Sequence, residues 1–301
     1  MIFNQRWMNN RLVIGTRGDT STKGDEKKGD YGEMLRNKKP FAAGKIGTAE
    51  LLALEYFDRY IRLPWPSFWS WQRPAQRLLN NAGFFPLDRK AFYQWNITFR
   101  NAIRQINYIC AWQQDSFLAA YEQALIKKVA PTSCPIEYKK IVGEALPAIS
   151  SVRWLVVSPF VKTMKQQLPR LAAIHRMPTI NEALWQKIEE TCQFVRCPFQ
   201  SHLEPSPFRD WQEGLESLSK EILAKDFDLA LIGAGAWSLP LASKIKQAGK
   251  SAIHMGGDIQ LLFGIKGGRW DHLGLYNECW IQPEADERPQ HRNRIEDGCY
   301  W

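Results

Sequence analysis

Two glycines and a serine stand where a buried strand meets a helix in the second half of the chain. Gly233 and Gly235 follow the apolar run FDLALI, and Ser238 opens the amphipathic stretch SLPLASKIKQAG. Glycine lets a backbone approach a phosphate closely, and the N–H groups and dipole at a helix start favour an anion. A dinucleotide-binding pattern would need a third glycine at Ser238 and an acid about 20 residues on, where Ile253 and His254 stand. The sequence therefore disfavours a dinucleotide and leaves two alternatives, a nucleotide or sugar-phosphate site and a turn without a ligand.

The next apolar run, SAIHMGGD, ends in a second group of polar and glycine residues. Carboxyl ends of parallel strands meet at one edge of a sheet, so His254, Gly256 and Gly257 are expected beside the Gly233 loop. A histidine there can donate to a phosphate or to a leaving oxygen. The alternative for His254 is a buried ring bonded to a backbone carbonyl.

Three more side chains are assigned to donor binding at the same edge. Ser158 ends the apolar run VRWLVVS, and Lys266 and Arg269 stand on the glycine-rich stretch GIKGGRW. Two cations on such a loop could close over a diphosphate. The alternative for Lys266 and Arg269 is a solvated basic loop.

The elements that must position these residues follow from apolar periodicity. Short β-branched runs at 152–158, 227–235 and 251–257 predict buried strands, and they alternate with amphipathic helices, one from 238 to 249 and one starting at Ser206. This alternation predicts an α/β fold with a Rossmann-like parallel or mostly parallel sheet.

The first half of the chain is predicted to be helix-rich. Asp88 is expected to cap one long helix, and Asp115 or Ser116 another. Residues 63–75, with three prolines, are expected to be irregular, and 16–32 to form a mobile surface loop. We expect an arm at 1–39 and one α/β domain at 40–301, helical over about 48–148 and Rossmann-like over about 150–301.

Bulk properties narrow the class of protein. The net charge of +9 favours anionic partners, but the scattered Lys and Arg come with no nucleic-acid-binding motif, so a nucleic-acid partner is not expected. No apolar run is long enough to span a bilayer, and the first residues do not resemble a signal peptide. The six cysteines form no CxxC pair, which favours a reducing, cytoplasmic location.

Glu50 stands in the first turn of a predicted helix, where an acid is often only a complement to the helix dipole. It follows Pro40-FAAGKIGTA, one of several stretches that resemble bacterial glycosyltransferases of the GT-D fold type. The resemblance rests mainly on FDLALIGAGAWSLPLASKIKQAGKSAIHMGGDIQLLFGIKGGRWD, with support from NNAGFFP, VVSPFVKTM, PFRDW and IEDGCYW, and spans most of 40–301.

The resemblance implies roles for the stretch Lys45 to Glu50. Better-known members carry an R-x-G-D-x-E motif whose two acids serve metal and donor diphosphate. Gly47 and Glu50 match the Gly and Glu of this motif. Lys45 stands at the position of its Arg, and Thr48 at the position of its Asp. The loss of one hard oxygen ligand puts Mg²⁺ or Mn²⁺ binding in question. Glu50 is thereby the leading catalytic candidate, as a base or as a metal ligand.

The expected activity is transfer of a sugar from a nucleotide-sugar donor to an acceptor hydroxyl, in assembly of a surface polysaccharide or glycan. The positive charge suits a lipid-linked acceptor and peripheral contact with the inner, anionic membrane face. The first alternative is a non-catalytic nucleotide- or glycan-binding protein on the same fold. A nicotinamide-dependent oxidoreductase and a nucleic-acid binder are further alternatives.

Overall fold

The computed structural model describes residues 31–37, 39–60, 71–113, 116–129, 146–177, 180–199 and 206–301. Its centre is one six-stranded sheet in the order β2-β1-β6-β5-β3-β4, and every pairing is parallel. The strands are β1 (Ala42–Gly44), β2 (Tyr108–Ile109), β3 (Trp154–Ser158), β4 (Gln193–Arg196), β5 (Leu229–Ile232) and β6 (Ser251–His254). The predicted α/β class with a parallel sheet is confirmed.

Apolar side chains cover both faces of the sheet. Successive residues of a strand point to opposite faces, so Leu155 and Val157 enter one core while Trp154 and Val156 enter the other. All residues of β3, β5 and β6 are buried. Parallel strands buried on both faces read as continuous apolar runs, which is why the sequence identified these three.

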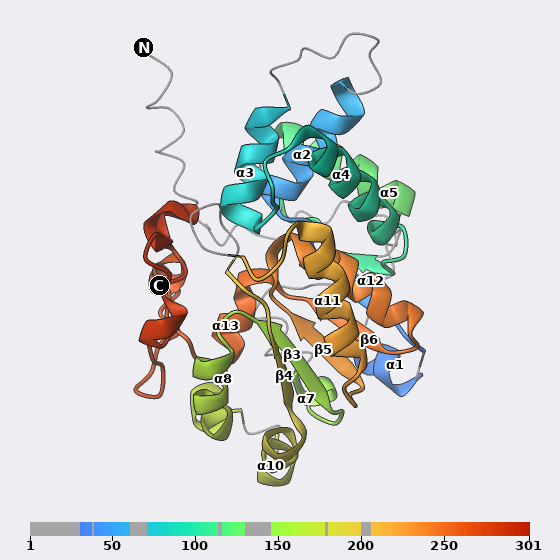
Figure 1. Ribbon diagram of the computed structural model, residues 1–301. Helices are drawn as coiled ribbons and strands as arrows, with labels where there is room; N and C mark the ends of the chain where they lie inside the picture. Colours follow the sequence, from blue (N-terminus) through green and yellow to red (C-terminus); the bar gives the residue numbers. More distant parts are fainter. Residues whose placement is uncertain are drawn as a thin grey trace.

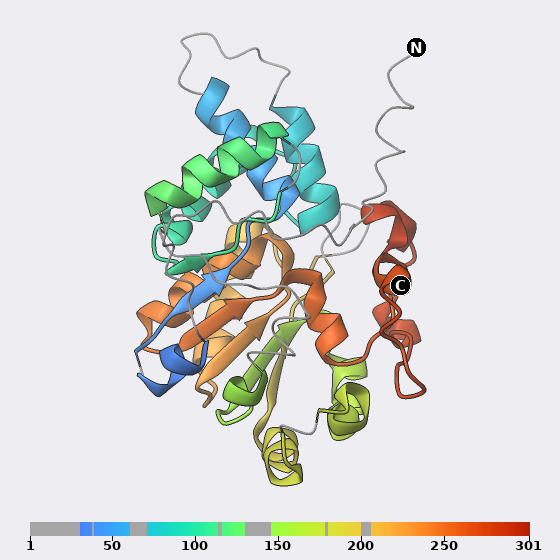
Figure 2. The same cartoon turned by 180° about the vertical axis from the view of Figure 1, so that it is seen from behind.

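Helices close the two cores (Figure 1 and Figure 2). The first core packs under α2 (Thr48–Tyr60), α3 (Gln72–Ala82), α4 (Arg89–Ile103), α5 (Ser116–Val129), α11 (Trp211–Leu223) and α12 (Ser238–Gln247). The second packs under α1 (Tyr31–Arg36), α7 (Leu146–Ile149), α8 (Val161–Gln167), α9 (Leu171–His175), α10 (Glu182–Thr191) and α13 (Ile259–Leu262). Helices α2 to α5 gather at the top of both views.

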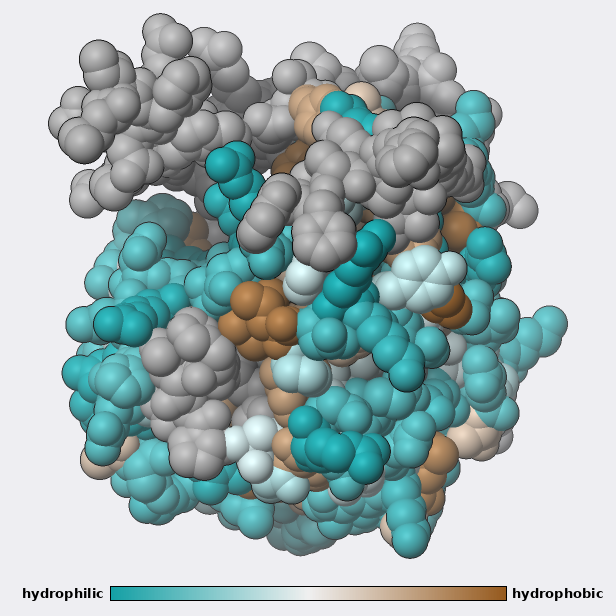
Figure 3. Space-filling view, turned by 45° about the horizontal axis from the view of Figure 1, so that its top comes forward, coloured by the Kyte–Doolittle hydropathy of each residue, from teal (hydrophilic) through white to brown (hydrophobic). Residues whose placement is uncertain are grey.

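Short 3₁₀ segments of three to six residues fill much of the remaining backbone. They are η2 (Leu168–Arg170), η3 (Gly235–Trp237), η4 (Gly256–Asp258), η5 (Gly268–Leu273), η6 (Ala285–Glu287), η7 (Arg292–Arg294) and η8 (Glu296–Gly298). The C-terminal segment, residues 285–301, runs along one side of the molecule, red in Figure 1. Among the described residues no helix is long and apolar enough to cross a bilayer. The face in Figure 3 is mostly hydrophilic, with small hydrophobic groups.

Several predictions about where helices begin and end agree with the structure. Asp88 caps α4, since its Oδ1 accepts from the N–H of Ala91 at 2.9 Å. Helix α12 ends close to the predicted Gly249, which has a φ of 82°. Asp115 lies outside the described residues, and α5 begins at Ser116.

Other local predictions were wrong. The helix expected from Ser206 begins instead at Trp211, because Asp210 provides the cap and accepts from the N–H of Glu213 at 2.9 Å. Ser206 forms its own turn by accepting from Phe208 N–H at 3.0 Å. Residues 72–75, expected to be irregular, belong to α3, and 61–70 lie outside the described residues. Of the expected loop at 16–32, residues 31 and 32 begin α1 and the rest lies outside the described residues.

Candidate functional site

The residues singled out in the sequence follow the ends of neighbouring strands and meet at the carboxyl edge of the sheet. Ile232 of β5 pairs with His254 of β6, and β1 lies on the other side of β6. A Cβ built on Gly233 would lie 2.7 Å from the carbonyl oxygen of Gly256. The expectation that His254 and Gly256 lie beside the Gly233 loop is therefore confirmed.

Lys45 lies at the centre of this edge, directly after β1. Its Nζ is 3.3 Å from Oδ2 of Asp258, which follows β6. The ammonium also lies 5.6 Å from the ring centroid of Trp112, which follows β2. Gly256, with a φ of 64°, makes room for the lysine, since a Cβ there would be 3.3 Å from Lys45 Cε. Lys45, which follows β1, thus contacts residues that follow β6 and β2, and its side chain is 20% exposed.

Glu50 is a buried carboxylic acid at the start of α2, only 6% exposed. Burial raises its pKa to about 7, and the negative charge of Glu296 adds to the shift, while a bond to its own backbone N–H opposes it. Its carboxylate folds back over Gly47, where any Cβ would collide with it. A side chain at position 47 would therefore require the Glu50 carboxylate to move.

Thr48 is bonded to a side chain from a distant part of the sequence. Its Oγ1 accepts from Nε2 of Gln113 at 3.1 Å. The loops after β1 and β2 are thereby joined next to Lys45. Trp112 strengthens the same junction, because its indole N–H donates to the carbonyl of Ile46 at 2.7 Å.

His254 is buried, and burial lowers its pKa to about 4, with the charge of Lys45 as the second cause. Its Nδ1 lies 3.2 Å from the N–H of Gly256 and 3.3 Å from the carbonyl of Ile232. A neutral ring either accepts from Gly256 or donates to Ile232, according to its tautomer. The histidine is thus neutral at pH 7 and bonded to backbone, and a catalytic role for it stays a prediction.

The glycines of the loop after β5 are required by contacts inside the protein. Gly235 has a φ of 53°, and a Cβ there would lie 2.5 Å from the carbonyl oxygen of Ala82 at the end of α3. Gly233 is packed against Ile259. The hydroxyl of Ser238 is fully buried and accepts from the N–H of Ala234 at 2.9 Å. Internal packing alone accounts for this sequence pattern, and its role in phosphate binding stays a prediction.

Ser158, also assigned to donor binding, is fully buried at the end of β3. Its Oγ accepts from the N–H of Phe160 at 3.2 Å and so forms the turn into α8. A ligand contact through this hydroxyl stays a prediction.

Arg269 and Lys266 are engaged with neighbouring side chains. The guanidinium of Arg269 pairs with Glu296 and lies 3.1 Å from the hydroxyl of Tyr300. Lys266 lies over the ring of Tyr276, with Nζ 5.8 Å from its centroid. Donor binding by either cation stays a prediction, and it would have to compete with these contacts.

The C-terminal segment also reaches this edge, which the sequence analysis did not foresee. Tyr300 packs on Gly257, where a Cβ would be 2.8 Å from Cε1 of the tyrosine. The tyrosine hydroxyl donates to Glu296 at 3.0 Å, and Glu296 acts on Glu50 electrostatically. Glu50 and Glu296 are about 250 residues apart in the sequence, so no local pattern predicts that they lie near each other. In the sequence only Gly257 and the following Asp258 indicated a site at this place.

The side chains at this edge do not suit a hard divalent cation. Among the described residues there is no group of three or more His, Cys, Asp or Glu that could hold a metal ion. Asp258 is paired with Lys45 and Glu296 with Arg269. Mg²⁺ and Mn²⁺ prefer several oxygen ligands, and the described part of the chain gathers no such group around Glu50.

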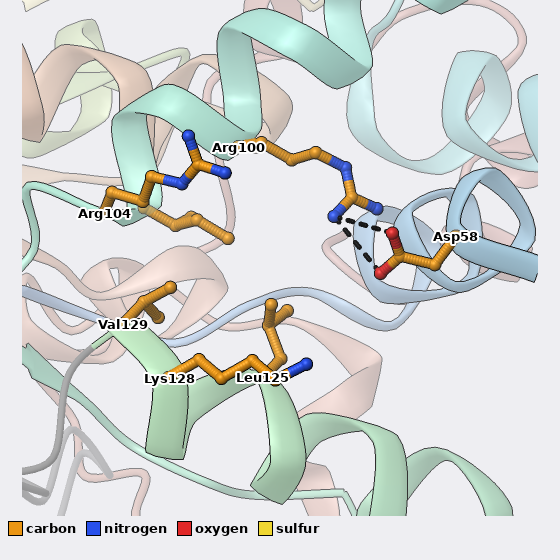
Figure 4. Close-up of a pocket in the computed structure, with 7 residues that line it drawn as sticks. Asp58, Arg100, Arg104, Leu125, Lys128 and Val129 are labelled. Carbon is orange, nitrogen blue, oxygen red and sulfur yellow. Dashed lines mark hydrogen bonds and ion pairs between the residues drawn. The ribbon is translucent and has the colours of Figure 1, made fainter. Parts of the chain in front are cut away.

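A separate hollow of about 390 Å³ lies among helices α2, α4 and α5 (Figure 4). It is lined by Asp58, Arg100, Ile103, Arg104, Leu125, Lys128 and Val129. Arg100 donates to Asp58 at 3.2 Å and to the carbonyl of Leu54 at 2.6 Å. Arg100 therefore holds α4 to α2, and the lining of the hollow includes none of the residues at the carboxyl edge.

Comparisons with known proteins add little to this geometry. The sequence matches no protein-family model and no curated protein. Among solved structures it is similar to one described as "Selenomethionine substituted structure of domain of unknown function 1792 (DUF1792)", with 12% identity, 88% of this chain and 98% of that chain covered, and a TM-score of 0.38. A likeness this distant supports no conclusion about activity.

Proposed function

We propose that this chain is a glycosyltransferase that moves a sugar from a nucleotide-sugar donor to an acceptor hydroxyl. The observation that carries the proposal is Glu50, a buried acid with a pKa raised to about 7, at the start of the helix that follows β1 at the carboxyl edge of a parallel sheet. Open parallel sheets bind ligands at this edge, and strongly shifted pKa values mark catalytic groups. The sequence resemblance to GT-D enzymes supplies the reaction type.

The reaction assigns one task to Glu50 and one to Lys45. The acceptor oxygen bonds to the anomeric carbon of the sugar, and the bond from that carbon to the diphosphate oxygen breaks. The electron pair leaves on the diphosphate, and the hydroxyl proton passes to the Glu50 carboxylate. A base with a pKa near the working pH combines a sizeable ionised fraction with proton affinity. Lys45 stabilises the negative charge that develops on the departing diphosphate.

Further groups at the edge complete the proposed donor site. The loop Gly233–Ser238, Gly256 and Gly257 would bring backbone close to the donor, and His254, neutral, would donate or accept a hydrogen bond rather than supply charge. Arg269 would join the diphosphate only after exchanging its bond with Glu296. We propose no metal-dependent step.

A second candidate is a non-catalytic nucleotide- or glycan-binding protein. The observation that favours it is that both cations nearest the edge are already paired, Lys45 with Asp258 and Arg269 with Glu296. Such a protein would bind the same ligands without consuming them.

A panel of nucleotide sugars separates these functions. Release of nucleoside diphosphate in the presence of glycan acceptors, with EDTA present, supports transfer, whereas saturable binding without release supports the second candidate. Lys45→Met should weaken nucleoside diphosphate binding about tenfold, the loss of one charge-assisted contact. Lys250→Met is the matched control, because Lys250 also lies over an aromatic ring, that of Phe227, but precedes β6 at the opposite edge.

The acceptor is proposed to be a glycan or a lipid-linked sugar at an anionic membrane face. The net charge of +9 supports this placement. Sedimentation with vesicles should then depend on anionic lipid and weaken with salt. Equal binding to neutral vesicles would contradict a charge-based contact.

A further inference from the structure

Trp112 is a large aromatic side chain left partly in water at the carboxyl edge. It follows β2 and is 37% exposed. Single exposed apolar residues are common, so exposure alone carries no meaning. What distinguishes Trp112 is the number of contacts that hold it in this position.

Three hydrogen bonds fix the tryptophan and its loop. The indole N–H donates to the carbonyl of Ile46 at 2.7 Å. The backbone N–H groups of Trp112 and Gln113 donate to one oxygen of Glu122, at 3.1 and 3.0 Å. Glu122 is only 1% exposed. A buried carboxylate therefore anchors an exposed ring, and the ring needs little ordering to bind a ligand.

The surroundings of the ring match one kind of ligand. Lys45 lies 5.6 Å from the ring centroid and offers a positive charge. Gln113 and Thr48, bonded to each other at 3.1 Å, offer an amide and a hydroxyl beside it. A flat apolar surface flanked by hydrogen-bonding groups and a cation suits a sugar ring that carries a phosphate.

We propose that Trp112 is a stacking platform for a pyranose ring whose phosphate is held by Lys45. The phosphate part of this inference rests on the proposed function. A sugar is favoured over a nucleobase because Trp112 joins the loop that leads directly into Glu50. The sugar bonded to the diphosphate lies next to the reacting carbon, whereas the base is separated from the diphosphate by a ribose.

Phe117 provides a matched control on α5. It is more exposed than Trp112, at 48%, and a cation also lies over it, with the Arg59 guanidinium carbon 4.9 Å from its centroid. Phe117 lies within a helix and does not follow a strand. If exposed aromatic area alone attracted sugars, Phe117 and Trp112 would behave alike.

The experiment measures the affinity of parent, Trp112→Ala, Trp112→Phe and Phe117→Ala for uridine and guanosine diphosphates with and without an attached hexose. Trp112→Ala should weaken hexose-bearing nucleotides about tenfold, the loss of roughly one ring contact, and leave the bare diphosphates unchanged. Trp112→Phe should retain part of the affinity, and Phe117→Ala all of it. Equal losses for both ligand types would assign the ring to the base and overturn the proposal, as would no loss.

A second arm is independent of nucleotides and tests whether the ring binds a sugar by itself. Methyl pyranosides and short oligosaccharides are titrated against the same proteins by saturation-transfer NMR. Contacts that vanish in Trp112→Ala and persist in Phe117→Ala support the platform even if no nucleotide binds, which would refute the proposed function alone. Absence of any Trp112-dependent sugar binding in both arms overturns the proposal.

Discussion

The ionisable residues at the two edges of the sheet differ in their surroundings. At the amino edge Arg153 precedes β3 and forms ion pairs with Asp226 and Asp228, with Nη2 to Asp228 Oδ1 at 2.8 Å, and these side chains are 37% to 75% exposed. At the carboxyl edge Glu50 and His254 are buried, with pKa values of about 7 and about 4. The ionisable groups at the amino edge are paired and partly exposed, whereas Glu50 and His254 at the carboxyl edge are buried and have shifted pKa values. Ionisable groups with shifted pKa values at a ligand-binding edge are candidates for catalysis.

Replacement of the buried acid should have the largest effect. Glu50→Gln keeps the shape but removes the base, and turnover should fall on the order of 10²–10⁴-fold, with donor affinity largely kept. Steady-state kinetics under saturating donor check this. Glu55→Gln is the control, since Glu55 lies on the same helix and pairs with Arg59 at 2.8 Å.

A different outcome would weaken the contrast between the edges. Full activity in Glu50→Gln would reduce this residue to a complement of the helix dipole, whose loss costs less than about 1 kcal/mol of stability. Equal losses in Glu50→Gln and Glu55→Gln would point to damage of α2 rather than to chemistry.

The loop after β5 should respond to substitution through stability. Gly235→Ala adds a Cβ 2.5 Å from the carbonyl oxygen of Ala82 at a φ of 53°, so strain and overlap should together cost about 2–5 kcal/mol. Gly249→Ala has the same kind of strain, at a φ of 82°, but nothing within 4 Å, and should cost about 1–2 kcal/mol. Denaturant unfolding of both variants measures the difference. Equal costs would mean that Ala82 moves away freely.

The sequence predicted the parts of the fold that have strong local patterns. Strands β3, β5 and β6 were recognisable because their apolar runs are four or five residues long and fully buried. Strands β1 and β2 have three and two residues, too few for any periodicity, and the outer strand β4 mixes Gln and Arg with apolar residues. These three strands were missed.

Local sequence patterns likewise predicted only part of the site. His254 could be placed beside Gly233 because both follow or end predicted parallel strands. Lys45 and Glu50, in contrast, were assigned to the site only by the resemblance to GT-D enzymes, since β1 was not predicted. The ion pair of Lys45 with Asp258 joins residues 213 apart in sequence, and the bond from Trp112 to Ile46 joins residues 66 apart. Such contacts arise from packing of whole elements, which no local pattern encodes.

The raised pKa of Glu50 makes a prediction about pH and stability. Its pKa is about 7 when folded against 4.5 as the reference, so the folded state binds more protons between these values and stability falls as pH rises through them. Relative to Glu50→Gln, the parent should lose about 3 kcal/mol of unfolding free energy from pH 4.5 to above 7. Denaturant midpoints over this range test it.

Comparison with Glu50→Gln is needed because two histidines make stability rise with pH, opposite to the effect of Glu50. Burial lowers the pKa of His254 and of His175 to about 4 from 6.5, so each contributes stability that is lost as pH falls through that range. Both proteins contain these histidines, and their contributions cancel in the difference. A flat difference between parent and Glu50→Gln would mean that Glu50 is ionised without cost and is a weaker base than proposed.

The smallest effect is expected at the amino edge. Arg153→Gln removes the guanidinium that holds Asp226 and Asp228, but the backbone N–H of residue 153 still donates to Asp228 at 3.0 Å, and exposed ion pairs contribute little. Nucleotide affinity and turnover should be unchanged, and any drop in thermal midpoint should shrink in high salt. Arg153 also lowers the pKa of Asp228, so the stability from that pair is lost as pH falls through the folded pKa. The variant should therefore differ from the parent mainly above that pKa and converge with it in acid, the reverse of the trend at Glu50. A loss of activity in Arg153→Gln would show that the two edges are coupled and that the separation between structural and functional charges is wrong.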